Sequence, residues 1–219
     1  MRKTTKSNSK RPLSGEIRTQ NHISGIYTRR INVNIIDIHR HRQLSAYYKQ
    51  YYFRFKSHLG FSPYINHILE SLPDLCFFPS FLLSYTLCRV NELDQITLSK
   101  LKQHAPLLIK SSKSAHIRTI EPLFPFKNPQ LQALSDQSFI MAISYDHLKQ
   151  SIKKTKILIN TPHVAKILDV THIFRHLQAS HLFSIGVPID TISYKLGHLF
   201  NKTTSHYIHK EFYSNCLKL

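Results

Sequence analysis

The segment His172-Ile173-Phe174-Arg175-His176 combines imidazole and guanidinium groups at helical spacing. Residues three apart on a helix share a face, so we expect His172 and Arg175 to project together while the two residues between them turn inward. A guanidinium stays charged and offers a planar fork of donors, which suits a phosphate oxyanion. A basic helix with a buried or capping histidine is the alternative. A metal site is not predicted from His172 and His176, because no Glu lies between them and no third ligand is evident.

A second group of candidate residues lies near the end of the chain. His198 directly follows Gly197, which we expect to end a helix, so that the imidazole ring can turn into a site. Tyr207 follows nine residues later.

Two further candidates precede these segments. Arg89 lies in Arg89-Val90-Asn91-Glu92-Leu93, where we expect a helix to lead toward a strand. Lys113 lies in a turn between two strand-like runs, and Lys110 is a nearby alternative to it as the candidate lysine. Both residue types favour an anionic ligand.

Together these segments resemble the tyrosine recombinase (phage integrase) family. That family shows an Arg in a G-L-R-x-S-E-L segment, a Lys in a β-hairpin, an H-x-x-R-H helix, an L-G-H turn and a Tyr followed by a short tail. The order in this chain is Arg89, Lys113, His172, Arg175, His198 and Tyr207. The intervals of 23 residues from Arg175 to His198 and nine from His198 to Tyr207 are similar to the family's. The resemblance covers about residues 60–219 and is most specific over 171–209.

The resemblance implies a site-specific DNA recombinase or integrase that cuts and rejoins duplex DNA through a 3′-phosphotyrosyl intermediate. It implies that Tyr207 is the nucleophile, that Arg89 and Arg175 hold the non-bridging phosphate oxygens, and that His198 adds a hydrogen bond. Fixed positive donors are the main catalytic contribution for such a transition state.

The resemblance also assigns the proton transfers and the partners. It implies that His172 helps to take the tyrosine proton and that Lys113 protonates the leaving 5′-oxygen. No step demands a metal or nucleotide cofactor, and the chain, with five glycines, has no Gly-rich phosphate loop. The implied partner is double-stranded DNA, and because strand exchange needs several copies we expect a homotetramer on DNA, with residues 214–219 docking on a neighbour.

Departures from the family's pattern keep other functions open. Leu87 replaces the glycine of the arginine segment, and the hairpin reads Ser-Ser-Lys-Ser-Ala in place of Thr-Lys-Thr-Gly. The segment before residue 60 is short for the DNA clamp that the family often carries. The alternatives are a catalytically impaired, recombinase-derived DNA-binding protein, a type IB topoisomerase, a telomere resolvase, and a basic RNA-binding protein.

Composition favours a nucleic acid partner. Thirty Lys and Arg against 12 Asp and Glu give a formal net charge of +18, and each cation that neutralises a phosphate releases counterions and adds affinity. Three separated cysteines indicate a reducing compartment, without a disulfide framework or a cysteine zinc site. The longest apolar stretch, Leu75–Leu87, is too short to span a bilayer and predicts a buried helix. An AT-rich genome, such as that of an organelle, plasmid or phage, would suit the composition.

We expect the chain to divide into a basic, partly disordered N-terminal arm with one helix over 1–58 and a catalytic domain over 59–219. The first residues suit either an organelle transit peptide or an arm lying on DNA. The basic aromatic run Tyr47–Lys56 predicts a helix, whose cations either meet phosphates or belong to an ordinary amphipathic helix. We expect an α+β fold, mainly α-helical, with a small antiparallel sheet. Its expected helices and strands cover 66–72, 77–87, 106–111, 116–120, 145–156, 171–185 and 190–196. A last short helix, capped by Thr203 or Thr204, is expected to carry Tyr207.

Overall fold

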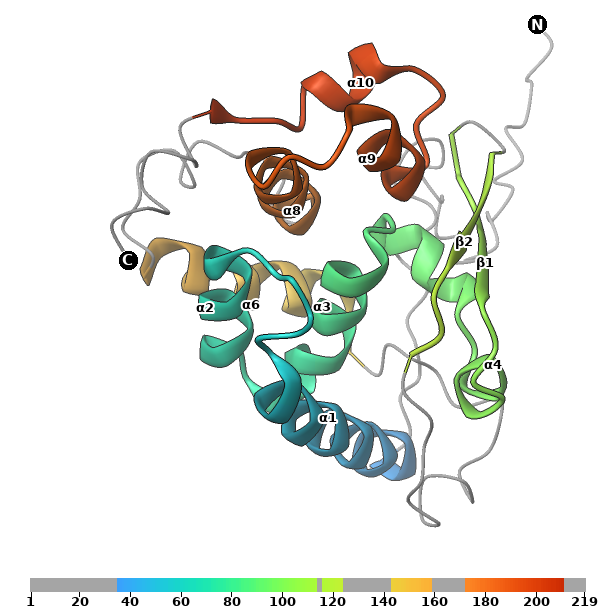
Figure 1. Cartoon of the computed structure of the whole chain (residues 1–219). Helices are drawn as coiled ribbons and strands as arrows, with labels where there is room; N and C mark the ends of the chain where they lie inside the picture. Colours follow the sequence, from blue (N-terminus) through green and yellow to red (C-terminus); the bar gives the residue numbers. More distant parts are fainter. Residues whose placement is uncertain (1–34, 114–115, 124–142, 159–171, 211–219) are drawn as a thin grey trace, which may run out of the picture.

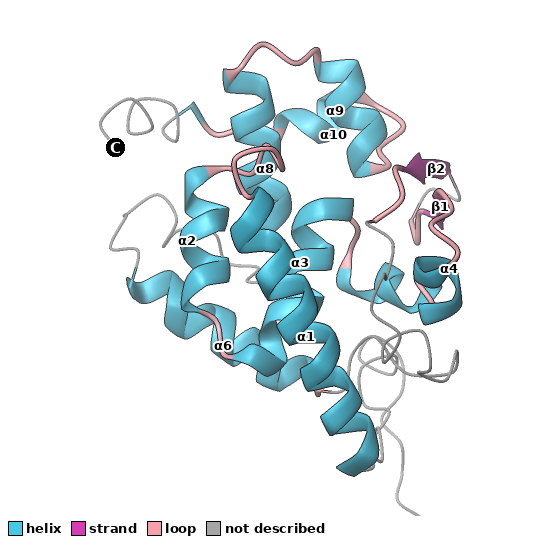
Figure 2. Cartoon of the chain, turned by 60° about the horizontal axis from the view of Figure 1, so that its bottom comes forward, coloured by secondary structure: helices cyan, strands magenta, loops and turns pink. Residues whose placement is uncertain are grey.

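The computed structural model describes residues 35–113, 116–123, 143–158 and 172–210, and the structural statements below refer to these residues. In chain order the elements are α1 (Ile35–Phe55), α2 (Pro63–Ser71), α3 (Asp74–Thr86), the 3-10 helix η1 (Val90–Gln95), α4 (Leu98–Lys102), β1 (Leu107–Lys110), β2 (Ile117–Ile120), α6 (Tyr145–Leu158), α8 (Ile173–Ser184), α9 (Ile189–Leu196) and α10 (Asn201–Ser205). The predicted class, mainly helical with a small antiparallel sheet, is confirmed. Helices α9 and α10 lie at the end of the molecule opposite α1, and the hairpin flanks them (Figures 1 and 2).

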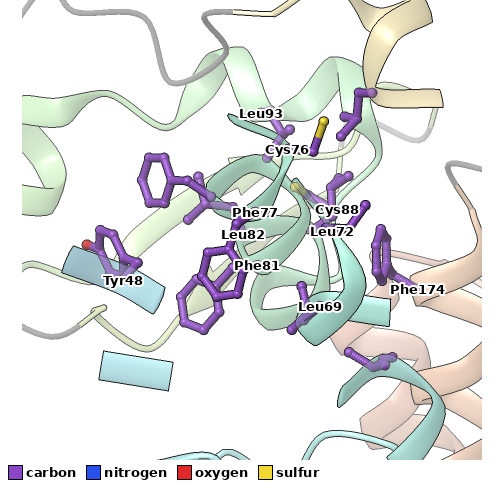
Figure 3. Close-up of a cluster of buried hydrophobic side chains, with 14 of the residues drawn as sticks. Tyr48, Leu69, Leu72, Cys76, Phe77, Phe81, Leu82, Cys88, Leu93 and Phe174 are labelled. Atoms are coloured by element: carbon purple, nitrogen blue, oxygen red, sulfur yellow. The ribbon is translucent and has the colours of Figure 1, made fainter. Parts of the chain in front are cut away.

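Helix α3 lies at the centre of the core (Figure 3). Its residues from Cys76 to Ser84 are all buried, which is expected of a helix that is apolar on every side. The predicted buried helix over Leu75–Leu87 is therefore confirmed, although it begins already at Asp74. Cys76 and Cys88 are buried free thiols, and Cys216 lies outside the described residues.

A proline inside α3 is compensated by a histidine from α1. Pro79 has no N–H, so it cannot donate to the carbonyl oxygen of Leu75 one turn earlier. The Nε2 atom of His41 donates to that oxygen instead, at 2.8 Å. His41 is buried, and burial lowers the pKa of its imidazole. The neutral ring thus replaces the missing backbone donor, as the need to pair buried carbonyls requires.

Helix α1 carries the basic aromatic run and packs against α3. Tyr48 and Tyr52 are fully buried, and Tyr48 stacks on Phe78 with ring centroids 4.6 Å apart. Lys49 pairs with a carboxylate of α3, and Lys56 pairs with one of α2. The rings of Tyr48 and Tyr52 therefore turn inward as expected, whereas that of Phe53 is exposed. Lys49 and Lys56 contact protein carboxylates.

The expected division of the chain at residue 58 has no break in the core to mark it. Leu44 and Tyr48 of α1 belong to the same buried cluster as Ile65, Phe81 and Phe174. Among the described residues, no helix is long and apolar enough to cross a membrane.

The two strands form a hairpin close to the predicted bounds. Leu107 pairs with Ile120, and Ile109 pairs with Arg118. Successive side chains point to opposite faces of a strand, so Arg118 shares the inward face with Ile109. The backbone N–H of Thr119 donates to the hydroxyl of Tyr194 at 3.0 Å, which joins the hairpin to α9.

The C-terminal helices end where the glycines predict. Gly186 and Gly197 have φ values of +87° and +67°, and they follow α8 and α9. Helix α10 differs from expectation in its start. It begins at Asn201, so the prediction that Thr203 or Thr204 caps it is wrong, and Tyr207 lies just past its end. Thr204 is fully buried, and its hydroxyl bonds to other side chains.

Candidate active site

Arg175 is a fully buried cation of the candidate site. It lies on the inward face of α8. Its guanidinium donates to the carbonyl oxygens of Leu87 and Leu196 and to the Nε2 atom of His198, the last at 3.1 Å. Burial lowers the pKa of Arg175 to about 10, and the charge of Arg89 adds to the effect. All three partners are neutral, so the residues that the structure describes compensate this cation poorly.

Helix ends supply the carbonyl partners of Arg175. Leu196 is the last residue of α9, and the last carbonyls of a helix have no partner within it. Leu87 ends α3 in the left-handed conformation, with φ at +51°. Both helix ends therefore converge on Arg175.

His198 follows Gly197 and turns inward, with 7% of its surface exposed. Because an arginine can only donate, the Nε2 atom that faces Arg175 must be the acceptor, which puts the proton of the neutral ring on Nδ1. Nδ1 bonds to the hydroxyl of Thr204 at 3.0 Å, and that hydroxyl bonds to Ser193 at 2.9 Å. Burial, together with the nearby arginines, lowers the pKa of His198 to about 3. The imidazole is therefore neutral at physiological pH.

Tyr207 is half-buried, and cationic and imidazole groups surround its ring. The guanidinium carbon of Arg175 lies 5.3 Å from the ring centroid, and the centroids of the His198 and His172 rings lie at 4.9 and 6.2 Å. His176 stacks on the ring, with centroids 4.4 Å apart and an interplanar angle of 24°. Two elements distant in sequence, α8 and the turn after α9, thus converge on this phenol.

A hydrogen-bonded chain fixes the backbone around Tyr207. The hydroxyl of Ser180 donates to the Tyr207 carbonyl at 3.1 Å and accepts from the backbone N–H of His209 at 2.9 Å. The ring of His209 bonds to His176 through nitrogen atoms 2.8 Å apart. The segment that carries Tyr207 is therefore tied to α8 at the tyrosine itself and at His209.

Arg89 meets Glu92 and Arg118 in a buried ionic group, which we call the arginine cluster together with Arg175. Glu92 is fully buried, and its Oε1 accepts from Arg89 Nη1 and its Oε2 from Arg118 Nη2, both at 2.9 Å. Burial alone would raise the pKa of Glu92, but hydrogen bonds from the backbone of Arg89 and Ser112 and from Arg118 outweigh it and lower the pKa to about 2.

The arginine cluster carries more positive than negative charge. Three guanidinium groups and one carboxylate give +3 − 1 = +2 within the cluster. The Nε atoms of all three arginines and the Nη1 atom of Arg118 are buried donors to which the described residues offer no partner. Buried, unbalanced positive charge with unused donors favours a bound anion.

Lys113 lies apart from these contacts. It is exposed in the turn that follows β1, and Lys110 is exposed on β1 itself. Residues 114 and 115 lie outside the described residues. The structure thus brings Arg89, Arg175, His172, His198 and Tyr207 into one region and places both lysines at its hairpin.

Four residues of the site were given no catalytic role from the sequence: Glu92, Arg118, His176 and His209. Glu92 had a local signal, since it lies one helical turn after Arg89. Arg118 had a weaker one, as a lone charge at an inward strand position. In the ranges that the structure describes, no three or more His, Cys, Asp or Glu side chains are grouped as metal ligands.

No curated protein matches the chain by sequence. XerA recombinase is structurally similar, with 17% identity and a TM-score of 0.49 over 71% of this chain and 62% of that chain. This chain therefore spans less than two thirds of the XerA chain. The catalytic domain of bacteriophage HP1 integrase has 20% identity and a TM-score of 0.47 over 71% of this chain and 90% of that one. The profile of the phage integrase family matches residues 64–213, which are 150 of the 219 residues, and the chain belongs to that family.

Proposed function

We propose that this chain is a tyrosine-type DNA strand transferase, a site-specific recombinase or integrase that acts on duplex DNA. The contact of Arg175 with both His198 and the Tyr207 ring carries the proposal. In this contact the phenol ring of Tyr207 lies beside a buried cation for which the described residues supply no carboxylate partner. Family membership and the net charge of +18 support DNA as the substrate.

In the proposed reaction the Tyr207 oxygen attacks a backbone phosphorus atom. A bond from the tyrosine oxygen to phosphorus forms, and the bond from phosphorus to the 5′-oxygen breaks. His172 takes the phenol proton, and Lys113 supplies a proton to the leaving 5′-oxygen. A 5′-hydroxyl of a second strand then attacks the phosphotyrosine, which reverses these transfers and restores the tyrosine.

The arginines act on the charge that develops on the non-bridging oxygens. Arg89 and Arg175 each keep a buried Nε donor without a partner among the described residues. A fixed donor in a site that excludes water stabilises such charge more than it would in water. In the DNA-free chain the His198 Nε2 atom accepts a hydrogen bond from Arg175. A phosphate that binds Arg175 in its place would leave this ring nitrogen without that bond.

Strand exchange between two sites requires more than one active tyrosine, so we propose that a homotetramer assembles on DNA. Residues 1–58 would supply a basic arm that adds contacts with DNA, beside a catalytic part over 59–219. The docking of residues 214–219 on a neighbouring copy remains part of the same proposal.

The test offers nicked duplexes, tiled through the DNA that flanks the gene, and measures a protein–DNA adduct that survives denaturation. Wild type should form the adduct, and Tyr207→Phe should form none. Tyr213→Phe, which removes the next tyrosine along the chain, is the matched control and should retain it. An adduct with Tyr207→Phe would refute the nucleophile. DNA binding without any adduct would support the impaired DNA-binding protein instead.

A further inference from the structure

We propose that Arg118 is a positioning residue that sets the distance between Arg89 and His198. The inference rests on the proposed function, since it concerns two residues of the same reaction. Arg118 and Arg175 are equally buried, but the Arg175 guanidinium lies beside the Tyr207 ring, whereas the Arg118 guanidinium contacts Glu92 and fills the space beside Gly197. Its contacts instead join the two halves of the site.

The first contact is with Glu92. Arg118 Nη2 donates to Glu92 Oε2 at 2.9 Å, and the same oxygen accepts from the backbone N–H of Arg89 at 2.9 Å. The other oxygen of Glu92 accepts from Arg89 Nη1 and from the backbone N–H of Ser112. Arg118 therefore holds the carboxylate that orients the Arg89 side chain.

The second contact is with Gly197, the residue before His198. A Cβ atom at Gly197 would lie 2.5 Å from Arg118 Nη1 and 3.3 Å from its guanidinium carbon. The guanidinium thus fills the space in which any other residue would place its side chain. Because Gly197 also has a φ of +67°, the turn that presents His198 is shaped around Arg118.

The hairpin is in turn fixed to α9, so Arg118 cannot shift freely. Thr119, the next residue of β2, donates from its backbone to the Tyr194 hydroxyl. His116 packs edge-on against the Tyr194 ring, with centroids 5.9 Å apart. These contacts hold β2 beside the helix that leads into the His198 turn.

Arg118 also acts on the charge of the site. The carboxylate of Glu92 pairs with both Arg89 and Arg118, so its negative charge is shared and does not fully neutralise Arg89. Loss of Arg118 would lower the cluster from +2 to +1 and leave Glu92 paired with Arg89. The remaining positive charge near a phosphate would then be weaker, in addition to the lost geometry.

A kinetic test separates positioning from stability. With the nicked duplex that gives an adduct, Arg118→Met should slow adduct formation about a hundredfold, the size of effect that a small misplacement produces. The Kd for DNA should stay close to that of Lys153→Met, which removes one exposed positive charge on α6 and serves as the charge-matched control. Arg118→Lys, which keeps the charge, should recover part of the rate.

The same variants should be compared on a duplex whose scissile phosphate is a neutral methylphosphonate. If Arg118 acts through the arginines that face phosphate charge, the defect of Arg118→Met shrinks by at least about tenfold on this substrate, because less charge needs stabilising. A defect of equal size on both substrates would overturn the electrostatic part of the inference and point to general destabilisation.

A second measurement does not depend on activity. The chain has five glycines, so a ¹⁵N-glycine-labelled sample gives at most five amide signals, and Gly197→Ala identifies one of them. Arg118→Lys should move the Gly197 signal and leave that of Gly186, which has nothing within 4 Å of its Cβ position, unchanged. An unmoved Gly197 signal overturns the inference. Absence of an adduct with wild type overturns the proposed function, while this signal still decides on Arg118.

Discussion

The imidazole of His176 lies stacked on the phenol ring of Tyr207, while its Nδ1 atom is hydrogen-bonded to His209. This arrangement ties the proposed nucleophile to the helix that carries Arg175. The stack restricts the tyrosine ring before any substrate is bound, which reduces the ordering needed for attack.

His176→Ala should therefore slow adduct formation by about tenfold, because an aromatic pair contributes about 0.5–1.5 kcal/mol and tenfold corresponds to about 1.4 kcal/mol. His176→Phe keeps a stacking partner and should lose much less. Single-turnover cleavage of the nicked duplex measures both variants. Equal losses for the two would show that the stack does not matter and that the bond to His209 does.

Glu92 should control stability at low pH. Its pKa is about 2 in the folded chain, below the ordinary value of 4.5. Because the folded pKa is lowered, its contribution is fully present above about pH 4.5 and is lost as pH falls toward 2, and it is on the order of 3 kcal/mol. Urea unfolding of wild type should therefore show a free energy of unfolding that falls as the pH is lowered from 4.5 toward 2.

Glu92→Gln should flatten the slope below pH 4.5 and destabilise the chain at neutral pH, where it leaves three buried guanidinium groups without a carboxylate. His198 provides an internal comparison. Its pKa is lowered from 6.5 to about 3, so its contribution begins to fade already below pH 6.5. A slope unchanged by Glu92→Gln would contradict the role assigned to this carboxylate.

Local spacing predicted much of the candidate site. The helical face of His172 and Arg175 and the glycine before His198 depend on contacts within one helix or turn, which sequence periodicity reports. The start of α10 was missed because a tertiary contact decided it. Thr204, expected at the cap, is drawn inward by its bonds to His198 and Ser193.

The arginine cluster could not be predicted in the same way. Arg118 and Glu92 are 26 residues apart, and they meet only because the hairpin folds back on the turn after α3. His41 and Leu75 are 34 residues apart, and the sequence shows Pro79 but not the donor that compensates for it. Pairings of this kind depend on how elements pack, which residue spacing along one element does not report.

The bond between His41 and Leu75 gives a stability prediction. His41→Leu should destabilise the fold by about 1–3 kcal/mol, because the Leu75 carbonyl is then buried without a donor. Pro79→Ala restores a backbone N–H that can reach this carbonyl. It should therefore rescue the His41→Leu variant more than it stabilises wild type. Urea unfolding of all four chains measures the coupling, and strictly additive effects would contradict it.

The two glycines that end α8 and α9 form a matched pair. Gly186→Ala and Gly197→Ala both place a Cβ on a residue with positive φ, which costs about 1–2 kcal/mol. Only Gly197→Ala also displaces a side chain, that of Arg118. We expect both variants to melt earlier, with the larger change for Gly197→Ala, and only Gly197→Ala to lose adduct formation. Equal activity in the two variants would show that Arg118 accommodates a side chain at Gly197 without consequence.

The two hairpin lysines can be separated by the chemistry of the leaving group. A substrate with sulfur in place of the bridging 5′-oxygen releases a thiolate, which needs no proton because a thiol has a pKa of about 8.5. Lys113→Ala should slow cleavage of the ordinary duplex by about a hundredfold or more, the usual contribution of general acid catalysis. It should cleave the sulfur-containing duplex at close to the wild-type rate. Lys110→Ala, one strand position from the turn, is the matched control and should behave like wild type on both substrates. If instead Lys110→Ala cleaves the ordinary duplex slowly and the sulfur-containing duplex at close to the wild-type rate, the proton donor is Lys110.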